Sequence, residues 1–269
     1  MRGKMVALGG LVVVAATGFA FAQNAKKAPG WWKPAPNLRV QILSEDEGSY
    51  AAQVRRGTQI VVIEGVKADY ADLKSEVESL RTRGVRVVCY HSLGWEKWRP
   101  DIGEFPQVAI GDKMADWDDE HWADTRPNSP AHAFWDRRYE NFARAGCDCV
   151  EDDNMVDPKT NLSGFAITHE EAAASAAHRA NKAHQLGMCH IAKNNPSMAA
   201  DYANSSDGVH IEEALQYNER AAYLPWRNAG RYAVMIEYDR KYCRPYPGFT
   251  VLVHPAGDYF DGRDAAYCD

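Results

Sequence analysis

Along most of the chain, short apolar runs alternate with longer stretches in which apolar residues recur at helical spacing. The run 59–66 is apolar and β-branched, and in the following stretch, 69–83, Leu73, Val77 and Leu80 are three or four residues apart. The first pattern is typical of a buried strand and the second of an amphipathic helix. The same alternation continues through the rest of the chain.

The pattern predicts eight strands and five helices. The strands are expected at 38–43, 59–66, 85–90, 146–154, 188–192, 208–211, 232–236 and 249–253. The helices are expected at 69–83, 131–145, 168–186, 196–203 and 217–229. At the start of the third helix, Thr168 is followed three residues later by Glu171, which is the sequence signature of a capping box.

Strands that alternate with helical connections pair in parallel through right-handed crossovers. Eight of them close into an α/β barrel of the (β/α)8 TIM type, and an open doubly wound parallel sheet is the alternative. A single barrel domain over 23–269 would contain 247 residues. Barrels of this kind commonly use about 250 residues, so we predict one domain.

A long segment from Trp95 to about residue 130 interrupts the alternation and is predicted to be a loop. It is rich in Trp, Asp and Pro, and loops of this length in compact domains are often functional. Its tryptophans either form platforms on which sugar rings stack or hold the loop in place. They are Trp95, Trp98, Trp117 and Trp122.

Ionisable residues gather where the predicted strands end. They are Glu64, His91, Asp153, Lys193, Glu212, Glu237 and His254. Barrel enzymes build their active sites at the C-terminal ends of the strands, so this distribution indicates a catalytic site there.

The strand at 146–154 ends in three consecutive acids. Because side chains of a strand alternate between its faces, Glu151 and Asp153 share one face and Asp152 takes the other. Asp153 and Glu212, on different strands, suit glycoside hydrolysis, in which one carboxyl group protonates the leaving oxygen while the other attacks or activates water. The alternative is that either acid is only a structural partner of Lys193 or of an arginine.

The first 22 residues have the features of a cleaved signal peptide. Arg2 and Lys4 precede an apolar run, and the small residues Ala20 and Ala22 flank Phe21 before Gln23. Secretion is therefore expected, with no membrane attachment after cleavage. Loss of this leader would change the formal charge from −6 to −8, which disfavours nucleic acid as a partner and favours a cationic or neutral substrate.

The six cysteines all follow the leader. An even number in an oxidising compartment indicates disulfides rather than a metal site. We expect Cys243 to pair with Cys268 and hold the C-terminal segment.

Short motifs are spread in order between residues 31 and 254. They are Trp31-x-x-Pro34-x-Pro36, Val88-Cys-Tyr-x-Ser92-x-Gly94, Trp98-Arg-Pro-Asp101, Trp122-x-Asp124-x-Arg126, Gly146-Cys-Asp-x-Val-Glu-x-Asp-Asn154, Gly164-Phe165, Lys193-Asn194, Glu212-x-x-x-Gln216-Tyr217 and Glu237-Tyr238. Together they resemble the barrel of glycoside hydrolase family 114, the endo-α-1,4-polygalactosaminidase family. The resemblance covers nearly all of the chain after the leader.

The resemblance implies that Asp153 is the nucleophile and Glu212 the general acid/base. It implies cleavage of internal α-1,4 bonds in a galactosamine-containing polysaccharide, which is cationic when its amines are free. We expect a monomer without cofactor or metal. The residues expected to bind substrate are Glu64, Tyr90, His91, Ser92, Trp98, Asp124, Glu151, Asn154, Lys193, Asn194, Tyr217 and Glu237.

The chain departs from the family pattern at several positions. Asp152 replaces a frequent proline, Ala214 replaces a usual cysteine, and His254 replaces a lysine of the last strand. Two alternatives therefore stay open: a glycan-binding barrel in which Asp152 has displaced the catalytic acid, and a hydrolase of neutral α-galactosides.

Overall fold

The computed structural model describes residues 38–43, 49–254 and 265–268. The leader expected at 1–22 lies outside these residues, so it stays a prediction. Among the helices that are described, none is both long and apolar enough to cross a membrane.

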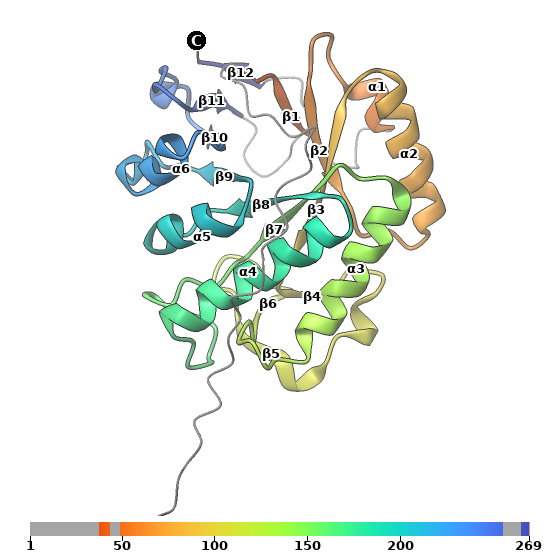
Figure 1. Ribbon diagram of the computed structural model, residues 1–269, viewed down its shortest axis with the longest axis vertical. Helices are drawn as coiled ribbons and strands as arrows, with labels where there is room; N and C mark the ends of the chain where they lie inside the picture. The colour runs from red at the N-terminus through yellow and green to blue at the C-terminus, as the bar shows by residue number, and fades with distance from the viewer. Residues whose placement is uncertain (1–37, 44–48, 255–264, 269) are drawn as a thin grey trace, which may run out of the picture.

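The centre of the fold is a curled sheet whose parallel strands follow the order of the sequence (Figure 1). In the described residues they are β1 (Val40–Ile42), β2 (Ile60–Glu64), β3 (Arg86–Ser92), β7 (Cys149–Asp153), β8 (Cys189–Lys193), β9 (Gly208–Glu212), β10 (Tyr232–Glu237) and β11 (Thr250–Val253). The predicted (β/α)8 barrel is confirmed. A doubly wound sheet would reverse its strand order within the sheet, and these strands do not.

A short antiparallel strand, β12 (Ala266–Tyr267), lies at the open edge of this sheet. It pairs with β11, where Leu252 is opposite Tyr267. The Tyr267 hydroxyl donates a hydrogen bond of 2.6 Å to the carbonyl of Val40 in β1, and the guanidinium of Arg39 lies 4.2 Å from the Tyr267 ring centre. This strand therefore fills the seam between the last and the first parallel strands, a role that the sequence pattern did not predict.

Three disulfides reinforce the barrel in the described residues. Cys243 pairs with Cys268, as predicted, and anchors the segment that contains β12. The neighbouring cysteines of the Cys-x-Cys motif take different partners, Cys147 with Cys89 and Cys149 with Cys189. The second of these bonds links β7 to β8.

Replacing both Cys243 and Cys268 with serine is expected to lower the free energy of unfolding by about 2–4 kcal/mol. The bond closes a loop of the unfolded chain and keeps β12 on the seam, and the double variant avoids leaving one unpaired thiol. Urea unfolding at neutral pH measures the change. An unfolding midpoint equal to that of the unmodified protein would show that the seam holds without the bond.

The helices cover the outside of the barrel (Figure 1). They are α1 (Tyr50–Gln53), α2 (Tyr70–Thr82), α3 (Ala131–Ala145), α4 (His169–Gln185), α5 (Ala199–Ser205) and α6 (Leu224–Asn228). The predicted capping box at Thr168 is present. The helix expected at 217–229 is wrong in extent, because Pro225 at the first turn of α6 lets a helix begin but not continue through it.

Alternate residues of each strand point into the barrel. Val62, Val88, Cys149, Ile191 and Val234 belong to one interior cluster. Their sequence neighbours pack outward against the helices, as Val150 does in a separate cluster. The strand face of a residue therefore decides whether its side chain can reach the mouth of the barrel.

The segment expected to be a loop contains a second sheet. Three short antiparallel strands, β4 (Trp95–Glu96), β6 (Glu120–Ala123) and β5 (Ile110–Lys113), are arranged in that order. Two 3-10 turns, Ile102–Glu104 and Gln107–Ala109, lie between them. Strands of two to four residues are too short to show an alternating pattern, which is why the sequence prediction failed here.

The tryptophans of this segment divide between the two expected roles. Trp95 and Trp122 pack against the hydrophobic core and hold the small sheet in place. Trp98 and Trp117 are 55% and 45% exposed and line a cleft at the mouth of the barrel.

Candidate active site

The turns that follow β7, β8 and β9 share one backbone feature. The residue after each strand is left-handed: Asn154 has φ 55°, Asn194 has φ 49° and Glu213 has φ 55°. Asparagine adopts this conformation readily, whereas for glutamate it is uncommon. The sharp turns stop the strands at Asp153, Lys193 and Glu212 and leave these three side chains over the barrel mouth.

A cleft of about 630 Å³ covers this mouth. Its walls come from the strand ends and from the small sheet above them. Of the residues predicted to act there, the ones that line it are Glu64, Tyr90, Trp98, Glu151, Asp153, Asn154, Lys193, Asn194 and Glu212.

The ammonium group of Lys193 joins the two predicted catalytic acids. Its nitrogen lies 3.2 Å from Oδ2 of Asp153 and 3.3 Å from Oε1 of Glu212. These two oxygens are therefore at most about 6.5 Å apart, the sum of the two distances. Burial opposes the charge of Lys193, but the carboxylates of Asp153, Glu212 and Glu151 raise its pKa well above the ordinary value, so it stays protonated.

Asp153 is held as a carboxylate. Its Oδ2 accepts a hydrogen bond of 2.9 Å from the Tyr90 hydroxyl, and its Oδ1 accepts one of 2.8 Å from the backbone N–H of Asn154. Burial opposes ionisation, but the charge of Lys193 and these hydrogen bonds outweigh it and lower the pKa of Asp153. Burial and the charge of Asp153 raise the pKa of Tyr90, which keeps its phenol protonated and able to donate.

Glu212 is oriented by three polar groups besides Lys193. The Tyr238 hydroxyl donates to its Oε1 at 2.6 Å, and the Asn194 side-chain amide donates to its Oε2 at 3.1 Å. The same Asn194 accepts a hydrogen bond of 2.8 Å from the Glu212 backbone N–H. The left-handed turn at Asn194 therefore fixes both the backbone and the carboxyl group of its neighbour.

Glu151 lies deeper, on the same face of β7 as Asp153. Its Oε1 is 3.6 Å from the Lys193 ammonium, and its Oε2 lies 2.7 Å from Nδ1 of His210. The other ring nitrogen of His210 is 2.7 Å from the Tyr232 hydroxyl. This chain of contacts forms the polar floor under the two acids.

Asp152 points to the opposite face of β7, as the alternation predicted. It is fully buried behind the strand, where Arg179 Nε lies 2.6 Å and His190 Nε2 lies 2.9 Å from its Oδ2. Its Oδ1 contacts His91 at 2.8 Å and Tyr139 at 2.5 Å. Burial opposes its charge, but His190, His91 and Arg179 hold the pKa of Asp152 well below its usual value.

Five predicted substrate-binding residues do not line the cleft. His91 lies on the outer face of β3 and contacts Asp152, while Ser92 is buried behind Asn154, whose amide donates to its hydroxyl. Asp124 forms a two-bond ion pair with Arg126 away from the mouth. Tyr217 is 61% exposed and lies outside the cleft.

Glu237, the fifth, is excluded by its strand face. Val234 and Ile236 of β10 point into the barrel, so Glu237 points outward, where its Oε1 accepts a hydrogen bond from the Leu215 N–H at 2.8 Å. The following residue, Tyr238, returns to the inner face and reaches Glu212. Strand alternation could have identified Tyr238 if the inner face of β10 were known. Both faces of β10 are apolar, so the sequence does not show which one points into the barrel.

The small sheet contributes cleft residues that the sequence analysis missed. Arg99 forms ion pairs with both Glu64 and Glu96, and Glu120 lies beside them on β6. All of these except Glu64 come from the segment predicted to be a loop, so no periodic pattern assigned a direction to their side chains.

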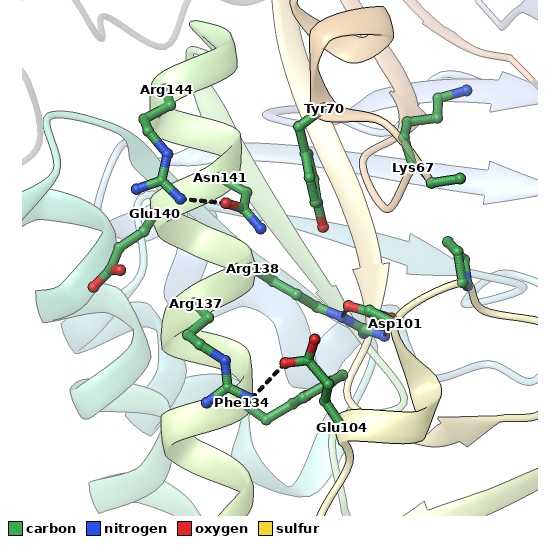
Figure 2. Close-up of a pocket in the computed structure, with 12 residues that line it drawn as sticks. Lys67, Tyr70, Asp101, Glu104, Phe134, Arg137, Arg138, Glu140, Asn141 and Arg144 are labelled. Carbon is green, nitrogen blue, oxygen red and sulfur yellow. Dashed lines mark hydrogen bonds and ion pairs between the residues drawn. The ribbon is translucent and has the colours of Figure 1, made fainter.

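A second cavity, of about 410 Å³, lies on the outside of the barrel between α3 and the segment before α2 (Figure 2). Its basic residues already have partners: Arg138 bonds to Asp101 at 2.8 Å, Arg137 to Glu104 at 3.3 Å, and Arg144 to Asn141. None of the strand-end acids lines it, so it is separate from the candidate active site.

Comparison with known proteins agrees with this geometry. A search of curated protein sequences found no match. The fold is similar to the crystal structure of Aspergillus fumigatus Ega3 in complex with galactosamine, with a TM-score of 0.77 and 23% identity over 91% of this chain and 100% of that one. It is also similar to the glycoside hydrolase domain of PelA from Pseudomonas aeruginosa, with a TM-score of 0.63 and 16% identity over 82% of this chain and 96% of that one.

The family model of glycoside-hydrolase family GH114 matches residues 21–256. This match includes every parallel strand of the barrel and the two acids Asp153 and Glu212. Of the described strands, only β12 lies beyond it. The chain is a glycoside hydrolase and belongs to family GH114.

Proposed function

We propose that the protein is an exported endo-acting hydrolase that cleaves α-1,4 bonds of a galactosamine-containing polysaccharide, with Asp153 as nucleophile and Glu212 as general acid/base. The observation that supports this most directly is the shared contact of both carboxyl groups with Lys193 at the mouth of the barrel. Export rests on the leader features of residues 1–22.

The assignment of Asp153 as nucleophile rests on its charge. A nucleophilic carboxylate must be ionised before it attacks the anomeric carbon. Lys193, Tyr90 and the Asn154 N–H all stabilise the ionised form of Asp153 and leave its lowered pKa well under neutral pH.

Glu212 is suited to the proton transfers by its position. It lies across the Lys193 ammonium from Asp153, so one carboxyl group can attack the anomeric carbon while the other gives its proton to the leaving oxygen and later takes one from the attacking water.

The separation of the two carboxyl groups is compatible with retention of configuration. In retaining enzymes the carboxyl groups are about 5–5.5 Å apart, whereas inverting enzymes leave about 6.5–9.5 Å for a water molecule. The oxygens of Asp153 and Glu212 that contact Lys193 are at most about 6.5 Å apart, so their separation reaches no further than the lower edge of the inverting range.

An amino-sugar polymer suits the character of the cleft. The acids Glu64, Glu96 and Glu120 line one side and would attract a cationic chain, while the exposed rings of Trp98 and Trp117 offer apolar faces for sugars. The similar Ega3 structure contains galactosamine. These features together favour galactosamine units over neutral sugars.

Replacing Lys193 with methionine is expected to move the lower acidic limb of the pH profile of kcat/KM, the limb set by ionisation of Asp153, upward by about 1–3 pH units. Asp153 has a lowered pKa because of this ammonium, so without it the carboxyl group would stay protonated, and inactive, to higher pH. A pH series of initial rates measures the shift. Lys97→Met, which removes a surface partner of Asp119, is the matched control. An unchanged acidic limb in Lys193→Met would contradict this role.

The function itself is tested by release of reducing ends from polygalactosamine and from its N-acetylated form. Faster release from the deacetylated polymer supports the proposal. Binding of the polymer without release would instead indicate a glycan-binding barrel, and equal rates on both polymers would indicate an enzyme that does not recognise the amine.

A further inference from the structure

Glu120 is a cleft carboxyl group that the proposed reaction does not use. It lies at the start of β6, in the small sheet above the barrel mouth, and is only 5% exposed. Its side chain lines the same cleft as Asp153 and Glu212.

Glu120 lacks the counter-charge that its neighbours have. Glu64 and Glu96 share Arg99, and Glu151, Asp153 and Glu212 share Lys193. Over the part of the chain that the structure describes, Glu120 forms no ion pair, and its side chain accepts one hydrogen bond, from the Asn154 amide at 3.5 Å. A nine-tenths buried carboxyl group in this state is costly unless it receives a partner.

The charged groups around Glu120 do not supply the missing counter-charge. The charged groups that face it are Glu96 at the end of β4, Arg99 in the following segment and Asp153 at the end of β7. Burial and the two acids raise its pKa to about 7, and Arg99 lowers it only in part because its guanidinium bonds to Glu64 and Glu96. A cation that arrives beside Glu120 would therefore be strongly favoured.

The proposed substrate carries such a cation on the carbon next to the reacting carbon. Asp153 would attack C1 of the sugar, and the amine of galactosamine is on C2. Positive charge develops at C1 in the transition state, so an ammonium group on C2 opposes it electrostatically unless an anion lies beside the amine. Asn154 links Glu120 to Asp153: its backbone N–H donates to Oδ1 of Asp153, and its side-chain amide donates to Oε2 of Glu120 at 3.5 Å, so Glu120 lies close to the carboxylate that would attack C1.

We propose that Glu120 is the counter-ion for the C2 ammonium group of the galactosamine unit that reacts, and that it makes the cleft selective for sugars whose amine is not acetylated. An acetamido group carries no charge and would leave Glu120 buried without a partner. This inference rests on the proposed function and specifies which side chain recognises the amine.

The test compares Glu120→Gln with Asp119→Asn, which removes one charge from the adjacent, exposed residue in the turn before β6. On a galactosamine oligomer, kcat/KM is expected to fall about 30-fold or more in Glu120→Gln and less than about 2-fold in Asp119→Asn. Between pH 5 and 7.5, kcat/KM of the unmodified enzyme should rise as Glu120 ionises, with a midpoint near its pKa of about 7. Glu120→Gln should lack this rise.

Binding measured in an Asp153→Asn background separates recognition from catalysis, because neither oligomer is then consumed. Addition of Glu120→Gln should weaken calorimetric binding of the galactosamine oligomer and leave that of the N-acetylated oligomer unchanged. Equal loss for both oligomers, or no loss for either, would overturn the inference while hydrolysis by the unmodified enzyme still supports the proposed function. Absence of hydrolysis by the unmodified enzyme would instead reject the proposed function.

Discussion

Hydrolysis of polygalactosamine by the Asp153→Asn variant is expected to fall about 10⁴-fold or more. Asparagine has the same shape and can still accept hydrogen bonds from Tyr90 and Lys193 at its carbonyl oxygen, so the fold should be unchanged. It carries no negative charge and cannot attack the anomeric carbon. Reducing-end release measures the loss, and an unfolding curve like that of the unmodified protein controls for folding.

The Glu212→Gln variant distinguishes the two roles. On the polymer it should lose about 10²–10⁴-fold, because the leaving sugar oxygen needs a proton. On an oligomer with an acidic phenol as leaving group, that proton is unnecessary, so Glu212→Gln should release the phenol rapidly and Asp153→Asn should not. The opposite result would exchange the two roles, and near-normal turnover by either variant on the polymer would remove that residue from the mechanism.

The Asp152→Ala variant is expected to lose about 3–5 kcal/mol of folding free energy. Asp152 is the buried acceptor for Arg179, His190, His91 and Tyr139. Its removal would leave the Arg179 guanidinium buried without its anion, since Arg179 is only 2% exposed. Urea unfolding at pH 7 measures the change, and Asp119→Asn, at an exposed pair, should change stability by less than about 0.5 kcal/mol.

The same carboxyl group predicts how stability depends on pH. Its pKa in the folded protein is well below the unfolded value of about 3.9. Its contribution is therefore complete above about pH 4 and is lost as the pH falls toward the folded pKa, because the unfolded chain takes up the proton first. Asp152→Asn should show a shallower loss of stability below pH 4. A parallel pH dependence in the two proteins would show that Asp152 is not a source of this acid sensitivity.

The elements that carry the strand-end acids could be predicted because each is long enough to show its period. Eight apolar runs separated by helical stretches imply a barrel, and the acids at their ends imply an active site at one rim. The alternation of Glu151, Asp152 and Asp153 was also predicted. It explains why the barrel accommodates Asp152 where the family pattern often has a proline. A side chain on the outer face of β7 meets α3 and α4 and leaves Asp153 in the cleft.

The rest of the site depends on contacts that no local pattern encodes. Arg99 and Glu120 acquire their directions from a sheet whose strands have two to four residues and pair antiparallel across a long segment. Glu237 and Tyr238 are adjacent in sequence, and only the closed barrel decides which of them faces the mouth. His91 and Asp124 occur in the family-like motifs, yet they contact structural partners instead of the cleft.

The contact between β12 and β1 also constrains the order in which parts of the barrel can form. Tyr267 and Val40, which it brings together, are separated by 227 residues. Contacts between such distant segments form slowly, and this one cannot form until Tyr267 has left the ribosome. The second edge of β1 is therefore covered only after almost the whole barrel has been synthesised. The Cys243–Cys268 bond then locks this last step wherever thiols can be oxidised. A chain that crosses a membrane before folding would thus complete its barrel on the far side.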